Sequence, residues 1–315
     1  MRLSLNEFVA SLSEVVATED GSWTIKGFID AYKNIYTISA DTKIISKILE
    51  IHLFPQIMEF AQRFGYKVVL ADKQNWYPDL TFVCEENESI KFAVDIKTTF
   101  RRNGKTAGFT LGSHGSYFKE RNKSKNIQFP YNQYAAHYCL GIVYTRNEIP
   151  DSEQLNIYKT EEIDATQSMV GYRKVTRVKK LESIVSVIKD FDFFVAEKWK
   201  IASDKQGSGN TANIGSISDI EDLKEGNGVF SSLGEKFFDE YWMNFGTAVL
   251  IKDGKPLKIK NIRDFLEFKG RLDLLEKLIQ NICQGTKDVC YSSTNKKSGN
   301  QNQAGSLDKT MSAFI

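Results

Sequence analysis

The stretch that most constrains the fold of this 315-residue chain covers residues 77–97. It holds two runs of β-type residues around the short polar segment 85–89, which has the composition of a hairpin turn. Because side chains alternate along a strand, Asp95 and Lys97 should share one face of the second run. The opposite face should carry an apolar row, Phe92, Val94 and Ile96. The second run is therefore predicted to be a buried strand with two charges on one side.

Asp79 begins the first run directly after Pro78, so a hairpin would bring its carboxylate towards Asp95 and Lys97. Carboxylate oxygens are preferred ligands of Mg²⁺. The ion is usually held by only one or two carboxylates, so positions in its coordination shell stay open for waters and a substrate phosphate. A lysine beside them can stabilise an attacking hydroxide or the charge that develops on phosphoryl oxygens. The three residues predict a site for metal-assisted phosphodiester hydrolysis. The motif alone is a weak signal, because Pro-Asp followed by Asp-x-Lys also arises by chance.

Composition limits the class of protein. With 41% hydrophobic and 26% charged residues, the chain resembles ordinary soluble globular proteins and can bury one large core or two modest ones. It has no apolar run of the roughly 20 residues that cross a bilayer, and residues 1–17 lack a signal-peptide core, so we expect a cytoplasmic protein without membrane contact. The net charge of +2 means that any nucleic-acid surface must come from local clustering.

The cysteines show neither the paired spacing of a zinc site nor the density of a disulfide framework. We therefore expect reduced thiols and no zinc site. The four residues concerned are Cys84, Cys139, Cys283 and Cys290.

Hydrophobic periodicity gives a coarse map of the elements. Apolar residues at helical spacing predict helices over residues 5–16, 41–65, 131–140, 237–244 and 262–282. Runs of β-type residues predict further strands over residues 23–29, 34–38, 67–71, 142–145 and 191–199. In the second helix Asp41 is the expected N-cap and Pro55 an expected kink. These elements indicate an α/β fold in which helices cover a sheet.

Three segments outside the strands are distinctive. Residues 119–125 are rich in lysine and arginine, which usually marks a solvated face but beside a phosphodiesterase site favours phosphate contacts. Residues 206–216 are rich in glycine but lack the lysine of a P-loop and the GxGxxG arrangement. They form either a flexible linker or a loop whose backbone approaches base edges. Residues 292–309 have almost no apolar side chains and are predicted to be disordered.

Several separated segments together carry a resemblance. The chain is similar to the type II restriction endonucleases of the PD-(D/E)xK nuclease family over most of its first 245 residues, and we find no counterpart for about the last 40. The matching segments recur in one order, which chance does not supply: residues 39–50, 74–81, 94–99, 109–112, 124–133, 141–146 and 207–216.

The resemblance implies roles for the charged residues. Asp79 and Asp95 would be the metal-binding carboxylates and Lys97 the catalytic lysine, with Mg²⁺ as the cofactor. Glu50 would be a further acidic residue of the metal site, whereas its sequence context alone fits a solvated glutamate at the edge of an apolar stripe. Ile96 is also among the implied metal-binding positions.

The resemblance also implies DNA contacts from three kinds of position. Gln74 and Asn75 would lie in a minor-groove loop. The positions near the DNA backbone would be Thr42, Lys43, Thr98, Thr99, Ser116 and Lys125. The major-groove recognition loop would supply Gly207, Ser208, Gly209, Asn210, Thr211 and Asn213. The chain departs from the family pattern at Trp76, where the family has a histidine, and at Gly115 and Ala212, where it has threonines.

We therefore predict an α/β protein with the PD-(D/E)xK restriction-endonuclease-like fold, a mixed central β-sheet flanked by helices, and a DNA-recognition subdomain. Residues 1–150 would form the dimerisation and catalytic subdomain, residues 151–285 the recognition subdomain with C-terminal helices, and residues 286–315 a polar tail.

By resemblance, the chain would be a homodimeric, Mg²⁺-dependent type II restriction endonuclease. It would cut both strands of duplex DNA at the palindrome GATATC and leave blunt ends. A cognate DNA methyltransferase is expected in the same system, though not as a physical partner. Two alternatives stay open, a structure-specific nuclease of the same family and a sequence-specific DNA-binding protein that has lost catalysis.

Overall fold

A central mixed sheet organises the computed structural model of the chain. The structure describes residues 7, 10–12, 25–32, 34–147, 186–207 and 212–275, and the backbone of 157–159, 165–170 and 173–178. The strand order is β12-β8-β5-β4-β3, with β6 paired to β5. Its strands are β3 (Tyr66–Leu70), β4 (Leu80–Cys84), β5 (Lys91–Arg102), β6 (Lys105–Thr106), β8 (Tyr134–Arg146) and β12 (Ile188–Glu197). Strands β5 and β8 run parallel and the other neighbours antiparallel, which confirms the predicted mixed α/β fold.

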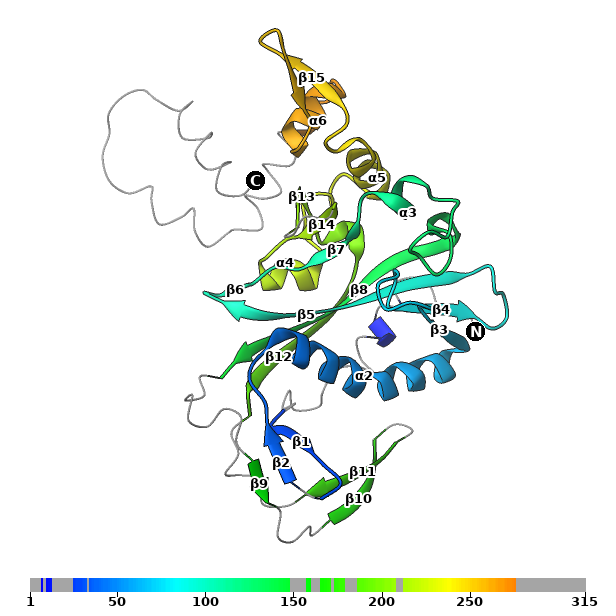
Figure 1. The fold of residues 1–315 in the computed structure, drawn as a ribbon. Coiled ribbons are helices and arrows are strands. Elements are labelled where there is room, and N and C mark those ends of the chain that lie inside the picture. The colour runs from blue at the N-terminus through cyan, green and yellow to red at the C-terminus, as the bar shows by residue number, and fades with distance from the viewer. Residues whose placement is uncertain are drawn as a thin grey trace, which may run out of the picture.

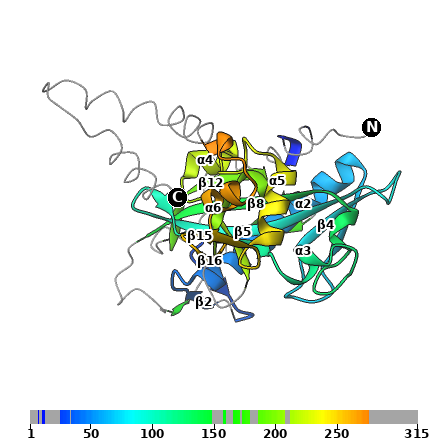
Figure 2. The ribbon, with the colours of Figure 1, turned by 90° about the horizontal axis from the view of Figure 1, so that it is seen from above.

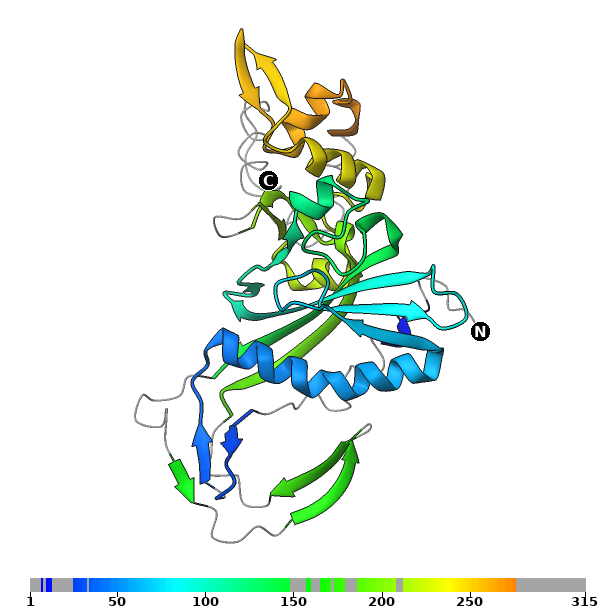
Figure 3. The same ribbon diagram turned by 45° about the vertical axis from the view of Figure 1, so that its right-hand side comes forward.

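Helix α2 (Thr42–Phe64) covers one face of this sheet (Figures 1 and 3). Asp41 caps it as predicted, because its Oδ1 accepts hydrogen bonds from the backbone N–H groups of Lys43 and Ile44. Gly65 follows the last turn in the left-handed conformation that commonly ends helices. Pro55 lies inside the helix without ending it.

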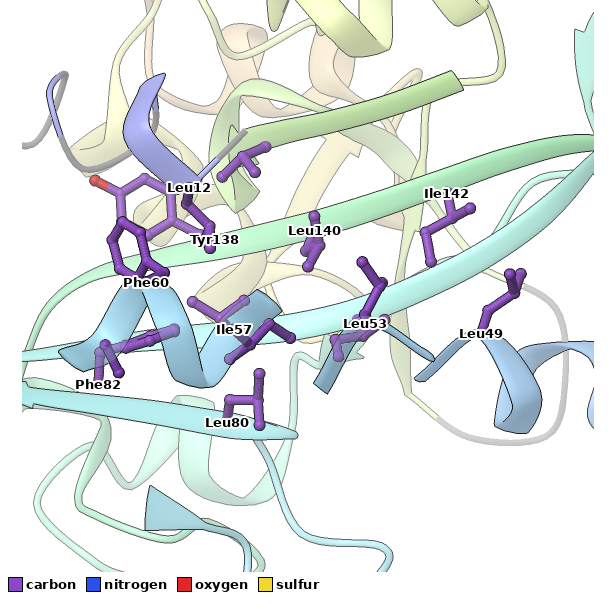
Figure 4. Packing of buried hydrophobic residues seen from close by; sticks show 14 of the residues in the cluster. Leu12, Leu49, Leu53, Ile57, Phe60, Leu80, Phe82, Tyr138, Leu140 and Ile142 are labelled. Atoms are coloured by element: carbon purple, nitrogen blue, oxygen red, sulfur yellow. The ribbon is translucent and has the colours of Figure 1, made fainter. Parts of the chain in front are cut away.

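The interface between α2 and the sheet is the first hydrophobic core (Figure 4). Leu49, Leu53 and Ile57 of α2 are fully buried there. The sheet contributes the apolar row of β5, which consists of Phe92, Val94 and Ile96. The predicted alternation along this strand is therefore confirmed.

A second hydrophobic core fills the other face of the sheet, beneath the C-terminal elements (Figure 2). Ala93, two residues before Asp95 on the same strand, belongs to this core. The elements on this side are β7 (Thr110–Ser113), α3 (Ser116–Lys119), the 3₁₀ turn η3 (Lys198–Lys200), β13 (Ala202–Gln206), β14 (Asn213–Ser216), α4 (Ile220–Glu225), α5 (Glu235–Asn244), β15 (Val249–Lys252), β16 (Lys255–Lys258) and α6 (Ile262–Phe268). The charged face of β5 thus faces the junction between the sheet and these elements.

Smaller sheets lie beyond α2 (Figure 3). Strands β1 (Gly27–Ile29) and β2 (Asn34–Thr37) form the predicted antiparallel hairpin, and β9 (Ile157–Lys159) pairs with β2. Strands β10 (Ala165–Val170) and β11 (Arg173–Val178) form a separate hairpin. Strands from both sides of residue 150 thus share sheets, as β12 also does with β8 and β14 with β7. The subdomain division at that residue stays a prediction.

One predicted helix is wrong, and another is confirmed only in part. Residues 131–140 contain only a 3₁₀ turn (Tyr131–Gln133) before β8, whose side chains are buried almost throughout. A central strand covered on both faces has no polar alternation, so its sequence resembles that of a buried helix. The predicted helix over residues 262–282 is confirmed over Ile262–Phe268 as α6, which ends before Gly270, whose φ is 65°. Residues 273–275 are helical again, and residues 276–282 lie outside the described residues.

Several further predictions concern residues that the structure describes only in part. Most of the predicted helix 5–16 and the whole tail 286–315 lie outside the described residues. Cys84 and Cys139 are free and buried, whereas Cys283 and Cys290 lie outside the described residues. In the described part of the chain, no helix is long and apolar enough to cross a membrane.

The first core gives a test of the fold. Leu53→Ala removes a fully buried side chain between α2 and the sheet, so we expect the free energy of unfolding to fall by about 2–5 kcal/mol. Ile51→Ala is the matched control, because Ile51 lies on the same helix with 53% of its surface exposed and should cost at most about 0.5 kcal/mol. Urea denaturation followed by circular dichroism measures both. Equal losses of unfolding free energy in the two variants would contradict this placement of α2.

Candidate active site and DNA interface

The β4–β5 hairpin brings three charged side chains together. Leu80 pairs with Val94 in the register, so Asp79, which directly precedes β4, lies opposite Asp95. The Nζ of Lys97 is 2.6 Å from Oδ2 of Asp95 and 3.9 Å from Oδ2 of Asp79. One ammonium is therefore shared by two carboxylates, as the sequence predicts.

The backbone fixes the orientation of Asp79. Its Oδ2 accepts a hydrogen bond of 2.7 Å from the N–H of Ile96, which stands between Asp95 and Lys97 on β5. The preceding Tyr77–Pro78 bond is cis, and the Tyr77 hydroxyl is 3.0 Å from Nδ1 of the buried His137. The segment before Asp79 is thus anchored in the second core.

The neighbouring Asp95 carboxylate perturbs Asp79. Burial and the neighbouring charge of Asp95 raise the pKa of Asp79 to about 7, although Lys97 and the Ile96 N–H act in the opposite direction. Burial lowers the pKa of Lys97, but the attraction of Asp95 and Asp79 outweighs it, so this pKa lies above its usual value and Lys97 stays protonated. Two close carboxylates that repel each other form a donor set that suits a divalent cation.

Glu50 is not brought into this carboxylate pair. It lies on α2, where it forms an ion pair with Lys47. Among the described residues, no three acidic, histidine or cysteine side chains form a group that could hold a metal ion. Ser46, one turn earlier on α2, is hydrogen-bonded to Thr98 of β5, so this part of the helix does reach the strand that carries Asp95.

The predicted backbone-contact residues differ in exposure. Thr42 and Lys43 lie in the first turn of α2, where Lys43 is exposed. Thr98 is occupied by its hydrogen bond to Ser46, and Thr99 is only 4% exposed. The two threonines therefore have a packing role in this structure, and their contacts with DNA stay predictions.

Two pairs of predicted DNA contacts lie on exposed loops. Gln74 and Asn75 are exposed in the loop that leads to Asp79. Ser116 and Lys125 are also exposed and lie together, since the Ser116 hydroxyl donates to the Lys125 carbonyl at 3.5 Å. Trp76, one of the departures from the family pattern, is half-buried with the Nζ of Lys73 5.2 Å from its ring centre.

The predicted recognition loop joins β13 to β14. The Gly207 N–H donates to the Asn213 carbonyl at 2.9 Å and closes the loop at its base. Ser208, Gly209, Asn210 and Thr211 lie outside the described residues. A Cβ at Gly207 would lie 2.5 Å from Cγ2 of Thr110 on β7, so packing at the base of the loop requires glycine at this position.

Two residues that the sequence did not single out hold the base of this loop. His114 donates its backbone N–H to the Ala212 carbonyl at 2.8 Å, and its Nε2 is 2.9 Å from Nε2 of Gln206. The two side chains are 92 positions apart in the sequence, and no motif signals their pairing. A Cβ at Gly115 would lie 3.9 Å from that of Ala212, so two of the departures from the family pattern are neighbours.

Comparison with known proteins shows the family to which the chain belongs. The sequence profile of the family described as "Restriction endonuclease EcoRV" matches residues 19–172 and 166–270. The chain is also 34% identical over 264 residues to the type II restriction enzyme EcoRV of Escherichia coli, an alignment that covers 83% of this chain and 98% of that protein. The first matched segment contains Asp79, Asp95 and Lys97, and the second contains the β13–β14 hairpin. The chain therefore belongs to the EcoRV restriction endonuclease family, whose members are site-specific deoxyribonucleases.

Proposed function

We propose that this restriction endonuclease uses Asp79, Asp95 and Lys97 to hydrolyse both strands of duplex DNA within GATATC, leaving blunt ends. The observation that supports the catalytic assignment is the position of the Lys97 ammonium beside two carboxylates on adjacent strands. The family relation and the glycine-rich loop support the choice of sequence. Cleavage of plasmid DNA followed by mapping of the fragment ends tests the whole proposal.

The site suits Mg²⁺ as its cofactor. Asp79 and Asp95 would hold the ion, with Ile96 and Glu50 as the further implied positions. The fit rests on hard carboxylate oxygens whose mutual repulsion a divalent cation relieves. Such an ion activates a water molecule and neutralises charge on the reacting phosphate.

The side chains of the chain have distinct tasks in this proposal. Lys97 stays protonated, so it cannot take a proton from the attacking water and instead stabilises the negative charge that grows on the phosphoryl oxygens. Asp95 fixes the Lys97 ammonium at 2.6 Å. Asp79 is oriented by the Ile96 N–H and presents a carboxylate to the same point.

Recognition would come from the loop between β13 and β14. The Asn210 side chain can pair bidentately with the N6 and N7 edge of adenine, which is distinct in the major groove. A palindromic site is matched by two-fold symmetry in the protein, so we propose a homodimer that presents one loop to each half-site. A cognate methyltransferase in the same system would protect the host DNA.

Catalysis should be separable from binding. Asp95→Ala and Lys97→Ala should each lower the cleavage rate by roughly 10²-fold or more, because Asp95 would hold the metal ion and Lys97 would stabilise the charge on the reacting phosphate. DNA affinity, measured by gel shift without metal, should change little. Lys91→Ala is the control, since Lys91 lies at the far end of β5 and bonds to the Glu88 carbonyl. Cleavage at the wild-type rate by Asp95→Ala would contradict the assignment of Asp95 to the active site.

Metal affinity should depend on pH. Asp79 has a pKa of about 7, so below this value a metal ion must displace its proton. The apparent affinity should then fall by about tenfold for each pH unit below about 7 and level off above it. Electron paramagnetic resonance of free Mn²⁺ measures binding directly. Asp79→Asn should bind more weakly and without this pH dependence, and a pH-independent wild-type affinity would contradict the role of Asp79.

The sequence preference has its own test. Mapped fragment ends should fall within GATATC. Asn210→Ala should cut this site more slowly, because each bidentate contact between a side chain and a base edge contributes on the order of 1–3 kcal/mol in each half-site. Circular dichroism should show an intact fold. Asn227→Ala, an exposed change outside the loop, should cut normally. A different mapped site, or normal cutting by Asn210→Ala, would show that this loop does not read these bases.

A further inference from the structure

Lys198 is a charged side chain inside the second hydrophobic core. It begins the 3₁₀ turn η3 between β12 and β13 and is only 3% exposed. Within the described residues its Nζ has no hydrogen-bond partner. Burial of an ammonium without such a partner is unfavourable, so the fold holds this lysine at a cost in stability.

Aromatic rings surround the Lys198 ammonium. Its Nζ lies 5.0 Å from the ring centre of Tyr77 and 5.6 Å from those of Phe118 and Tyr131. These distances allow cation–π attraction, which is strongest where water is excluded. A Cβ at Gly112 would lie 2.7 Å from the Tyr117 hydroxyl, so glycine there leaves room for Tyr117, and it would lie 3.6 Å from this Nζ, which places the ammonium beside Gly112.

Neighbouring charges do not replace these ring contacts. Asp95 and Asp239 attract the ammonium of Lys198, but neither is hydrogen-bonded to it, and Asp239 is already paired with Arg121. The positive charges of Arg121 and Lys97 repel it. Burial is the largest influence and lowers the pKa of Lys198 to about 7. The rings of Tyr77, Phe118 and Tyr131 are thus its immediate contacts.

The position of Lys198 links the recognition hairpin to the catalytic site. Tyr77 stands two residues before Asp79, and its hydroxyl is held by His137. Lys198 is on the segment that enters β13 and the recognition loop. Gly112 is on β7, which pairs with β14 on the other side of that loop. The Lys198 ammonium therefore lies beside Tyr77, on the segment that carries Asp79, and near Gly112 on β7, while its own backbone leads into β13.

We propose that Lys198 is a positioning residue that couples the recognition hairpin to Asp79 through the Tyr77 ring. A shift of the 3₁₀ turn when the loop engages DNA would move the ammonium, the ring and the Asp79 carboxylate together. A methionine of similar volume would fill the same space without a desolvation cost, so stability does not account for the lysine. The inference rests on the proposed catalytic role of Asp79.

Lys198→Met separates this role from a structural one. At a pH below about 7, where Lys198 is protonated, the single-turnover cleavage rate with saturating enzyme should fall by about tenfold or more, as loss of a desolvated cation–π contact implies. DNA affinity without metal should stay within about twofold of wild type, and the thermal midpoint should be unchanged or higher. Lys200→Met is the matched control on the same turn, because the Lys200 side chain is half-buried and paired with Glu197, and this variant should cleave normally.

A double-mutant cycle tests the path through Tyr77. Tyr77→Leu removes the ring. The double variant with Lys198→Met should cleave no more slowly than the slower single variant, because both substitutions remove the same contact. A wild-type rate in Lys198→Met, a rate loss that accompanies a lower thermal midpoint, or additive losses in the cycle would each overturn the inference. Failure of the proposed function would give a different result: Asp79→Ala would retain cleavage, whatever the cleavage rate of Lys198→Met.

Discussion

The two-sided burial of β5 is the constraint on which the rest of the structure depends. Three alternate side chains of this strand, Phe92, Val94 and Ile96, enter the core beneath α2, and this fixes the register of β5 against β4 and β8. A shift by one residue would move Asp95 and Lys97 into that apolar core. Such a shift is strongly unfavourable, because it would bury charges among apolar side chains. The packing of Phe92, Val94 and Ile96 thus positions the charges on the opposite face.

The same strand shows why part of the fold and site could be predicted from the sequence. Local patterns are sufficient for the hairpin around residues 85–89, the Asp41 cap and the convergence of Asp79 on Asp95 and Lys97, because each depends on neighbouring residues. The first part of β8, up to residue 140, has a helix-like pattern because burial on both faces removes the alternation that identifies a strand, whereas residues 142–145 are correctly predicted as a strand. Gly270 ends α6 early, and its left-handed backbone is visible only in the structure.

Contacts between distant positions could not be predicted in this way. The pairing of His114 with Gln206, the rings around Lys198 and the neighbouring positions of Gly115 and Ala212 each join segments that the fold alone brings together. The resemblance supplied DNA-contact positions, yet it did not show that Thr99 is buried or that Thr98 is held by Ser46. These details separate residues that support the scaffold from residues that are free to meet DNA.

The hydrogen bond from Gly207 to Asn213 has a consequence for how such a protein can diverge. It closes the loop at its base, and the contacts of Gln206 and Ala212 with His114 hold the adjoining backbone. The base of the loop is therefore held by residues 206, 207, 212 and 213, and changes in loop length alter the closure entropy only slowly. Under the proposed function, mutation could explore new base preferences in the loop while the proposed hydrolytic residues on β5 are inherited intact.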